Sequence, residues 1–185
     1  MLYHSFISLV EYPEDSGCYS WGWQESSFGN VSTVWIDDVL VGVHFFDTEN
    51  ECRSCLSRFK IEDKADTRNK ETLKLIHAFS DKISWENYCS SIKVGLCGTD
   101  FQIKTWQAIA EISWGETCSY GEVSNKVSGK PAARAVGQAC SSNLLALIIP
   151  CHRVVSASLS KFNYRWKPWR KKLLLEHERR NRAKV

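Results

Sequence analysis

Residues 121–140 read Gly-Glu-Val-Ser-Asn-Lys-Val-Ser-Gly-Lys-Pro-Ala-Ala-Arg-Ala-Val-Gly-Gln-Ala-Cys and decide how the second half of the chain folds. Two short helical segments, Gly121–Val127 and Ala132–Cys140, flank the turn-forming residues 129–131. The pattern predicts a helix-turn-helix, although an ordinary helical hairpin fits it as well. Small side chains in the second segment favour the first reading, because they leave a slim surface that can approach a groove. Arg134 stands at the start of that segment, where a helix N-terminus also favours phosphate.

Helical spacing continues on both sides of this stretch. Apolar residues in Phe101–Ile112 recur at three- and four-residue intervals, which predicts an amphipathic helix. Pro168–Arg182 is a further expected helix, because Pro168 stands near its first turn, where a missing N–H costs little. Between them lies the short apolar run Leu145–Ile149, which we expect to be buried.

The first half of the chain has a different pattern. Val31–Ile36 and Val39–Phe46 are apolar and β-branched, and only two aspartates separate them, which predicts a β-hairpin. Helical spacing follows in Asn50–Lys60 and in Lys70–Ser80. Two segments without such spacing are expected to be irregular: Met1–Asn30 and Glu62–Asn69.

The change of pattern falls near residues 92–99 and predicts two domains, residues 1–95 and 96–185. We expect an α+β fold, in which a small sheet-and-helix domain precedes a mostly helical domain with a helix-turn-helix of the winged-helix-like kind. Residues 1–97 hold nine Lys and Arg against fifteen Asp and Glu, whereas residues 98–185 hold fifteen against six. The basic half is therefore expected to meet a polyanion, although a solvated surface with a basic tail gives the same balance.

Eight cysteines in 185 residues would fit a disulfide framework in a secreted protein. Residues 1–10 lack the basic start and the cleavage site of a signal peptide, and no apolar run approaches the ~20 residues that cross a bilayer. We therefore expect a cytoplasmic protein, or a nuclear one in a eukaryote, with no membrane association and mostly buried thiols. Cys52 and Cys55 form a Cys-x-x-Cys pair without a partner pair, so we expect no bound metal.

The segment Ile148-Ile-Pro-Cys-His-Arg-Val-Val155 carries the chemistry. Cys151 stands at the end of the buried apolar run and is followed by His152. A thiolate is the reactive form of cysteine, and a neighbouring histidine favours it. On its own, such a pair also fits a buried structural thiol beside an exposed imidazole.

Further motifs resemble those of the O6-alkylguanine-DNA alkyltransferases, also called methylated-DNA–protein-cysteine methyltransferases. Pro150-Cys-His-Arg-Val154 resembles the active-site signature of this family. The other matching stretches follow in the family's order: Gly98–Ala108, Gly115–Val123, Ala133–Gly137, Asn143, Asn163–Trp166 and His177–Glu178. The resemblance covers about residues 95–180 and points to the bacterial-type branch. The first half of the chain resembles the family only in its strand–strand–helix layout.

The resemblance implies a role for each matching residue. Cys151 would be the nucleophile and alkyl acceptor, His152 the base that deprotonates it through a water, and Glu178 the carboxylate that orients the histidine. Tyr120 would help to expel the base and protonate guanine N3, and Arg134 would fill the gap in the base stack. The remaining residues implied to contact DNA or substrate are Ser119, Ala135, Gly137, Asn143, Val154, Tyr164 and Arg165.

Some of these contacts are implied in more detail. Asn143 would brace the turn that joins the recognition helix to an active-site strand. The carbonyls of Cys151 and Val154 would receive the guanine amino group, while Tyr164 and the N–H of Arg165 would form the pocket wall near O6.

The implied function is DNA repair by one irreversible transfer of an alkyl group from O6-alkylguanine to the protein, with O4-alkylthymine as a second candidate substrate. The implied partner is double-stranded DNA, bound by a monomer through the minor groove with the damaged base flipped out, and no cofactor is needed. Two alternatives stay open. The first is a non-enzymatic lesion-binding module, although relatives of that kind lack the acceptor cysteine that this chain has at Cys151. The second is a thiol-dependent hydrolase or redox protein, a function that would not need the helix-turn-helix.

Two departures from the family pattern concern the pocket. The loop Ser156–Phe162 has no glycine where relatives usually have one or more, and Trp166 stands where some relatives have a small residue. We therefore expect a tight pocket that disfavours bulky adducts. We expect no methyl-sensing regulatory role, because the chain is too short for the cysteine-ligated module of regulatory relatives.

Overall fold

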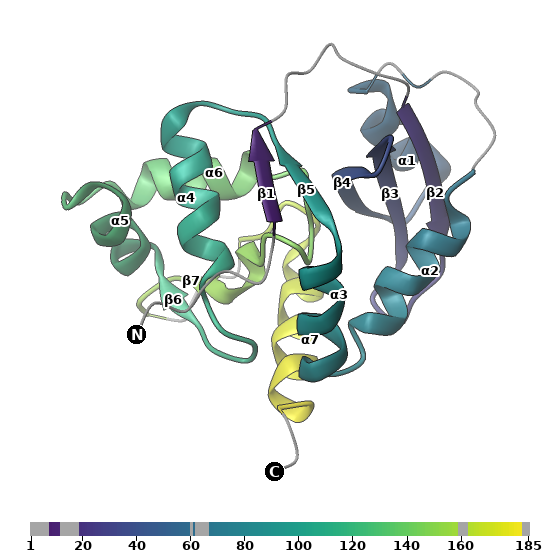
Figure 1. Cartoon of the computed structure of the whole chain (residues 1–185). Helices are drawn as coiled ribbons and strands as arrows, with labels where there is room; N and C mark the ends of the chain where they lie inside the picture. Colours follow the sequence, from purple (N-terminus) through teal and green to yellow (C-terminus); the bar gives the residue numbers. More distant parts are fainter. Residues whose placement is uncertain (1–7, 12–18, 60, 62–66, 159–162, 183–185) are drawn as a thin grey trace. The chain divides into compact units, whose positions relative to one another are not determined.

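The computed structural model describes residues 8–11, 19–59, 61, 67–158 and 163–182 (Figure 1). The chain divides into two compact units, one formed by residues 6–97 and the other by the chain from residue 98 onward. The first unit contains a mixed sheet with helices, and the second is mostly helical with a two-stranded sheet. The fold is α+β, as the sequence predicts.

A five-stranded sheet forms the first unit, in the order β1-β5-β4-β3-β2. Its strands are β1 (Ser8–Glu11), β2 (Tyr19–Gln24), β3 (Asn30–Ile36), β4 (Val39–Phe46) and β5 (Lys93–Leu96). The predicted hairpin is present as β3 and β4, which pair antiparallel across a two-residue turn. Asp37 adopts a left-handed φ of 48° in that turn, a conformation that aspartate tolerates better than most residues.

The prediction that residues 1–30 are irregular is wrong for β1 and β2. The sequence of β2, Tyr-Ser-Trp-Gly-Trp-Gln, holds a glycine that strands disfavour. Gly22 is required there because the backbone of Arg68 passes so close that a Cβ would lie 2.2 Å from the Arg68 carbonyl carbon. The strand therefore depends on a contact with a residue far away in the sequence, which local spacing does not reveal.

Three helices complete the first unit: α1 (Glu49–Ser57), α2 (Asn69–Ala78) and α3 (Lys82–Ser91). The first two lie within three residues of their predicted bounds, and Thr48 caps α1 by accepting the N–H of Glu51. Helix α3 was not predicted, and Asp81 caps it in the same way. Of the predicted loop 62–69, residues 62–66 lie outside the described residues and Asn69 already belongs to α2.

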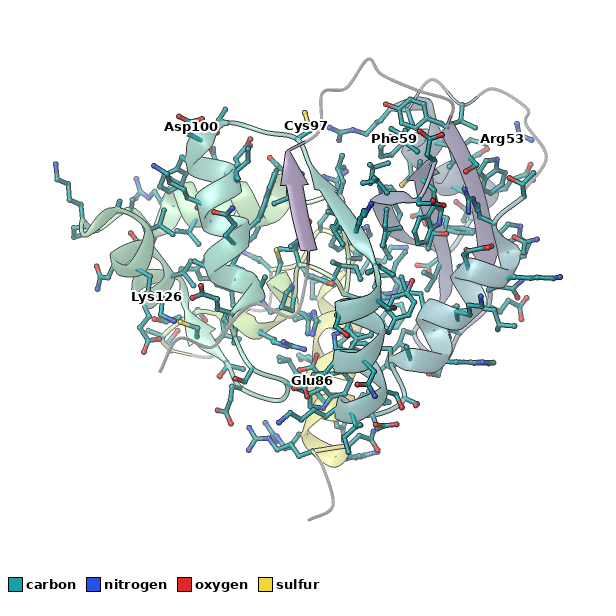
Figure 2. The ribbon with its side chains drawn as sticks, in the orientation of Figure 1. Arg53, Phe59, Glu86, Cys97, Asp100 and Lys126 are labelled. Atoms are coloured by element: carbon teal, nitrogen blue, oxygen red, sulfur yellow. The ribbon has the colours of Figure 1, made fainter. Side chains whose placement is uncertain are left out.

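The first helix of the second unit is α4, and Asp100 is its first residue (Figure 2). Its elements are α4 (Asp100–Ala110), β6 (Cys118–Ser119), α5 (Tyr120–Ser128), α6 (Ala133–Ser142), the 3-10 helix η1 (Cys151–Arg153), β7 (Val154–Val155) and α7 (Pro168–Arg180). Capping boxes fix the starts of α4 and α5, through Thr99 with Gln102 and through Ser119 with Glu122.

The predicted helix-turn-helix is formed by α5 and α6. Gly129 ends α5 with a left-handed φ of 63°, and the Ser124 hydroxyl bridges the turn by donating to Lys130 O and accepting the N–H of Ala132, both at 2.6 Å. Helix α4 packs against both helices, and the Trp106 indole N–H donates to Ala139 O at 2.9 Å. The turn and the support behind it hold α6 in a fixed orientation within this unit.

Candidate active site

Cys151 lies in a tight turn rather than in the expected active-site strand. It begins the three-residue helix η1, and β7 starts only at Val154. Pro150 explains the difference, because it has no N–H for a strand ladder, and its carbonyl instead accepts the N–H of Arg153 at 2.8 Å. The Cys151 side chain is only 2% exposed.

Asn143, at the end of α6, holds this turn in shape. Its amide nitrogen donates to Ile149 O at 3.0 Å and to the Cys151 sulfur at 3.2 Å, and its oxygen accepts the N–H of Leu145 at 2.8 Å. One buried side chain thus links the end of α6, the apolar run Leu145–Ile149 and the Cys151 sulfur.

A buried carboxylate lies behind the cysteine turn. Glu178 of α7 contacts His152 Nε2 at 2.7 Å and accepts the Arg153 guanidinium at both oxygens at 2.9 Å. The N–H of Gly115 donates to the same carboxylate at 2.9 Å. Because His152 and Glu178 are both fully buried, their contact is protected from solvent screening.

Burial and pairing set the charges of this group. Burial opposes the charged form of Glu178, but His152 and Arg153 outweigh it and lower the carboxyl pKa to about 2. For His152, burial lowers the pKa below its ordinary 6.5, although Glu178 acts in the opposite direction. At neutral pH the site therefore holds a carboxylate beside a neutral imidazole, which can accept a proton.

Burial raises the pKa of the Cys151 thiol well above its ordinary value, and the neighbouring Cys140 acts in the same direction. The Asn143 amide and the Lys171 ammonium lower it, but by less. The resting sulfur is therefore a thiol, and it needs a base to react.

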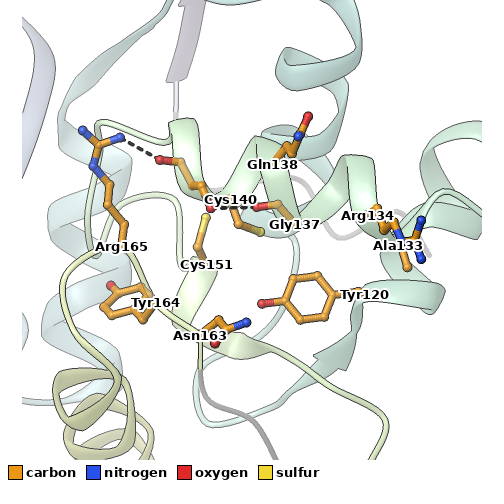
Figure 3. A pocket seen from close by; sticks show the side chains of 11 residues that line it. Tyr120, Ala133, Arg134, Gly137, Gln138, Cys140, Cys151, Asn163, Tyr164 and Arg165 are labelled. Carbon is orange, nitrogen blue, oxygen red and sulfur yellow. Dashed lines mark hydrogen bonds between the residues drawn. The ribbon is translucent and has the colours of Figure 1, made fainter.

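Cys151 lines a cavity of about 560 Å³, which is within the usual size range of small-molecule sites (Figure 3). The other lining residues are Tyr120, Ala133, Arg134, Gly137, Gln138, Cys140, Ser141, Asn163, Tyr164 and Arg165. The Tyr120 hydroxyl points into the cavity, and burial raises its pKa to about 12, so it stays protonated. The cavity therefore presents a thiol and a protonated phenol to a molecule that enters it.

The residues expected from the sequence fall into three groups. Those that line the cavity are Cys151, Tyr120, Arg134, Gly137, Tyr164 and Arg165. Those that support the Cys151 turn are Asn143, His152 and Glu178. Those that do neither are Ser119, which caps α5, Ala135, which lies on α6, and Val154, whose carbonyl accepts the Lys171 ammonium at 2.5 Å.

Several residues of the site were not assigned by sequence reasoning, and three of them affect the charges and thiols near Cys151: Arg153, Lys171 and Cys140. Arg153 forms an ion pair with Glu178, and Lys171 is fully buried, which is unusual for a lysine. A signal existed for Lys171, because it shares one face of α7 with Leu174 and Glu178, at intervals of three and four residues. A polar residue on the buried face of a helix usually has a hydrogen-bonding or oppositely charged partner.

Within the described residues, no three His, Cys, Asp or Glu side chains come together in a way that could hold a metal ion. Among the described helices, none combines the length and the apolar character needed to cross a bilayer.

Comparison with known proteins identifies relatives of the second unit. The family model of the 6-O-methylguanine DNA methyltransferase DNA-binding domain matches residues 100–180. A methylated-DNA–protein-cysteine methyltransferase from Mycobacterium leprae is 49% identical over 89 residues, which are 48% of this chain and 54% of that protein. One from Saccharomyces cerevisiae is 41% identical over 86 residues, 46% of each chain. The matches thus span about half the length of these relatives.

Solved structures extend the likeness to the first unit. The crystal structure of Mycobacterium tuberculosis O6-methylguanine methyltransferase has a TM-score of 0.72 and 27% identity, and the match covers 91% of this chain and 97% of that one. A crystal structure of Mycobacterium tuberculosis OGT in complex with DNA has a TM-score of 0.67 and 26% identity, covering 88% and 94%.

Fold and site define a class of protein in which a cysteine, backed by a buried histidine–glutamate pair, lines a cavity beside a helix-turn-helix. The sequence motifs, the family model and the relatives all match the methylated-DNA–protein-cysteine methyltransferases. Residues 100–180 match the DNA-binding domain of the 6-O-methylguanine DNA methyltransferases, in agreement with the resemblance that the sequence motifs show.

Proposed function

We propose that this protein repairs DNA by moving an alkyl group from O6 of a damaged guanine to the sulfur of Cys151, once per molecule. One observation carries the proposal. The Cys151 sulfur lines a cavity bordered by α6 and has a buried imidazole–carboxylate pair beside it. The names of the relatives, and the DNA bound to one neighbouring structure, support the same activity.

The substrate is double-stranded DNA, and the damaged nucleotide leaves the base stack to reach the buried sulfur. Flipping a base costs a few kcal/mol, which stacking and pocket contacts offset. Small residues along α6 suit entry into the minor groove, and Arg134 near its start fills the gap left by the base. Ala132 precedes α6 and has no side-chain acceptor, so the first N–H groups of the helix can bind a phosphate.

The sulfur is activated through the pair behind it. A water relays the Cys151 proton to His152, whose lowered pKa keeps it neutral and able to accept. The negative charge of Glu178 stabilises the imidazolium that forms, at a hydrogen-bond distance of 2.7 Å. Because the resting thiol is protonated, the sulfur becomes strongly nucleophilic only when this transfer occurs.

The alkyl transfer is a single displacement at carbon. A C–S bond forms as the C–O6 bond breaks, and the electron pair passes into the guanine ring. Tyr120 donates a proton to N3, which neutralises the leaving guanine. The product is a thioether, which has no easy hydrolytic exit, so the protein acts once.

The other expected contacts orient the guanine. Tyr164 and the N–H of Arg165 face O6, and the carbonyls of Cys151 and Val154 accept the guanine amino group. The Val154 carbonyl already accepts Lys171, but a carbonyl oxygen has a second lone pair. Asn143 fixes the sulfur relative to α6. The protein binds as a monomer and works where the DNA is, in the cytoplasm or in a nucleus.

The decisive experiment incubates the protein with a duplex that carries one O6-methylguanine and then weighs the products. We expect one added methyl group per protein molecule, on the peptide that contains Cys151, and an unmodified guanine in the DNA. Cys151→Ser should bind the same duplex but remove no methyl group. Multiple turnover, or a methyl group on another residue, would contradict the proposal. If the wild-type protein binds the lesion and transfers nothing, the alternative of a non-enzymatic lesion-binding module is supported instead.

A further inference from the structure

A second thiol lies in the same cavity as Cys151, and the proposed repair reaction does not use it. Cys140 belongs to α6 and is half-buried, and its side chain lines the cavity together with Cys151 (Figure 3). Cys140 lies close enough to Cys151 to help raise the pKa of the Cys151 thiol. Both cysteines are free thiols in this structure.

We propose that Cys140 and Cys151 are a redox pair, which a hydroperoxide small enough to enter the cavity converts into a reversible disulfide. In the first step, one thiol attacks the peroxide and becomes a sulfenic acid, and water or an alcohol leaves. In the second step, the other sulfur attacks the sulfenic sulfur, the S–S bond forms, and water leaves. Two thiols are oxidised by two electrons, and one peroxide is reduced.

The surroundings of the pair favour the second step. The cavity admits small molecules, so a peroxide can reach sulfurs that are otherwise buried. The Asn143 amide donates to the Cys151 sulfur at 3.2 Å, and together with the Lys171 ammonium it partly offsets the burial that keeps this sulfur protonated. The two residues lie on different elements, the end of α6 and η1, so the bond needs side-chain rotation and a small shift rather than the breaking of a helix.

The disulfide would protect the sulfur of Cys151. A sulfenic acid without a neighbouring thiol oxidises further to a sulfinic acid, which common thiol reductants do not reverse. A disulfide stops at an oxidation state that thiols reverse. The pair itself does not depend on the proposed function, but the consequence for repair does, because an oxidised Cys151 cannot accept an alkyl group.

Mass spectrometry of a single peptide tests the pair. Trypsin cuts after Arg134 and Arg153 and at no position between them, so residues 135–153 carry both cysteines. The full-length protein is treated with at least two equivalents of hydrogen peroxide, one more than the disulfide requires, and free thiols are then blocked with iodoacetamide. We expect this peptide to be lighter by about 2 Da, to carry no blocking group, and to regain both thiols after dithiothreitol.

Two variants sharpen the result. In Cys140→Ser the same peptide should gain about 32 Da as a sulfinic acid that dithiothreitol does not remove. Cys97→Ser serves as the control, because Cys97 is exposed and outside the cavity, and it should give the wild-type result (Figure 2). Oxygen on Cys151 beside a free Cys140 in the wild type would overturn the proposal. So would a disulfide that forms elsewhere while residues 135–153 stay reduced.

Methyl transfer provides a separate readout. After peroxide and then dithiothreitol, the wild type should regain the methyl transfer of its own untreated sample, whereas Cys140→Ser should not regain that of its own. Equal recovery in both proteins would overturn the protective role. If untreated wild type transfers no methyl group, the proposed function fails, while the 2 Da loss still decides the redox pair.

Discussion

At the residue scale, Glu178 controls both the charge and the stability of the site. Its carboxylate is fully buried and neutralises Arg153, so Glu178→Gln leaves a buried guanidinium without its counter-charge. Breaking a buried pair in this way costs about 3–5 kcal/mol. We expect that loss in the free energy of unfolding, measured by urea denaturation.

Glu176→Gln is the matched control for this substitution. Glu176 lies on the same helix but is exposed, and it pairs with Arg180 at the surface. Such pairs contribute about 0.3–0.5 kcal/mol, so this variant should stay close to the wild type. Equal losses of unfolding free energy in the two variants would show that the buried Glu178 carboxylate contributes no more to stability than an exposed one.

The same residues predict how stability depends on pH. The pKa of Glu178 is lowered from 4.5 to about 2 in the folded chain, so its contribution is complete above pH 4.5 and is lost as the pH falls towards 2. The pKa of His152 is lowered from 6.5, so the unfolded chain takes up that proton first and stability also falls on acidification below pH 6.5. The wild-type advantage over Glu178→Gln should therefore shrink between pH 4.5 and 2. An advantage that stays constant over that range would contradict the assignment.

Motifs predicted several residues that lie together around Cys151, but not all of their contacts. Cys151, His152 and Glu178 were expected together, and the structure brings the last two to 2.7 Å. Arg153 stands inside the same motif, yet nothing in its spacing reveals that its guanidinium turns inward. No motif pointed to Lys171, and lysine is usually exposed, whereas here its ammonium group is buried on carbonyl oxygens.

At the element scale, the turn between α5 and α6 depends on Gly129. Its φ of 63° is strained for any residue with a Cβ, although no atom lies within 4 Å of where a Cβ would stand. Gly129→Ala should therefore cost about 1 kcal/mol through backbone strain alone. Thermal or urea unfolding would measure this loss.

For Gly121→Ala, in the same helix, we expect the opposite change, which is a gain in stability. Gly121 has an ordinary helical backbone, and its added Cβ would meet only the Ser119 hydroxyl oxygen at 3.8 Å. Alanine is preferred to glycine in a helix, so this variant should gain about 0.4–1 kcal/mol. If both alanine variants shift stability in the same direction, the left-handed turn does not control the motif.

Elements were predictable where the signal is local. Helices α4, α5 and α6 lie within two residues of their predicted bounds, because amphipathic spacing and turn residues define them. Helix α3 escaped prediction because its spacing is weak, with Ile83 exposed and Trp85 stacked on Tyr88. Strands β1 and β5 pair in parallel over more than 80 residues of sequence, and no local pattern encodes such a partner.

At the scale of the whole molecule, charge separates the two halves of the chain. Residues 98–185 carry a net charge of +9 and residues 1–97 one of −6. If DNA binds the second unit, affinity should fall steeply and linearly with the logarithm of salt concentration, since each phosphate contact releases a counterion. Substitutions of basic residues should then matter in the second unit and not in the first.

Arg134→Ala and Arg53→Ala test this division directly. Arg134 is exposed on α6 at the cavity, whereas Arg53 is exposed on α1 and pairs with Glu49 (Figure 2). Removing one cation from the DNA interface should lower the affinity for a lesion-bearing duplex and reduce the salt slope by about 1. We therefore expect a weaker and less salt-dependent Arg134→Ala, and an Arg53→Ala that matches the wild type, in fluorescence-anisotropy titrations from 50 to 200 mM salt, the range over which phosphate contacts weaken. Equal weakening by both substitutions would mean that DNA covers the acidic half as well, and that the charge division does not mark the binding surface.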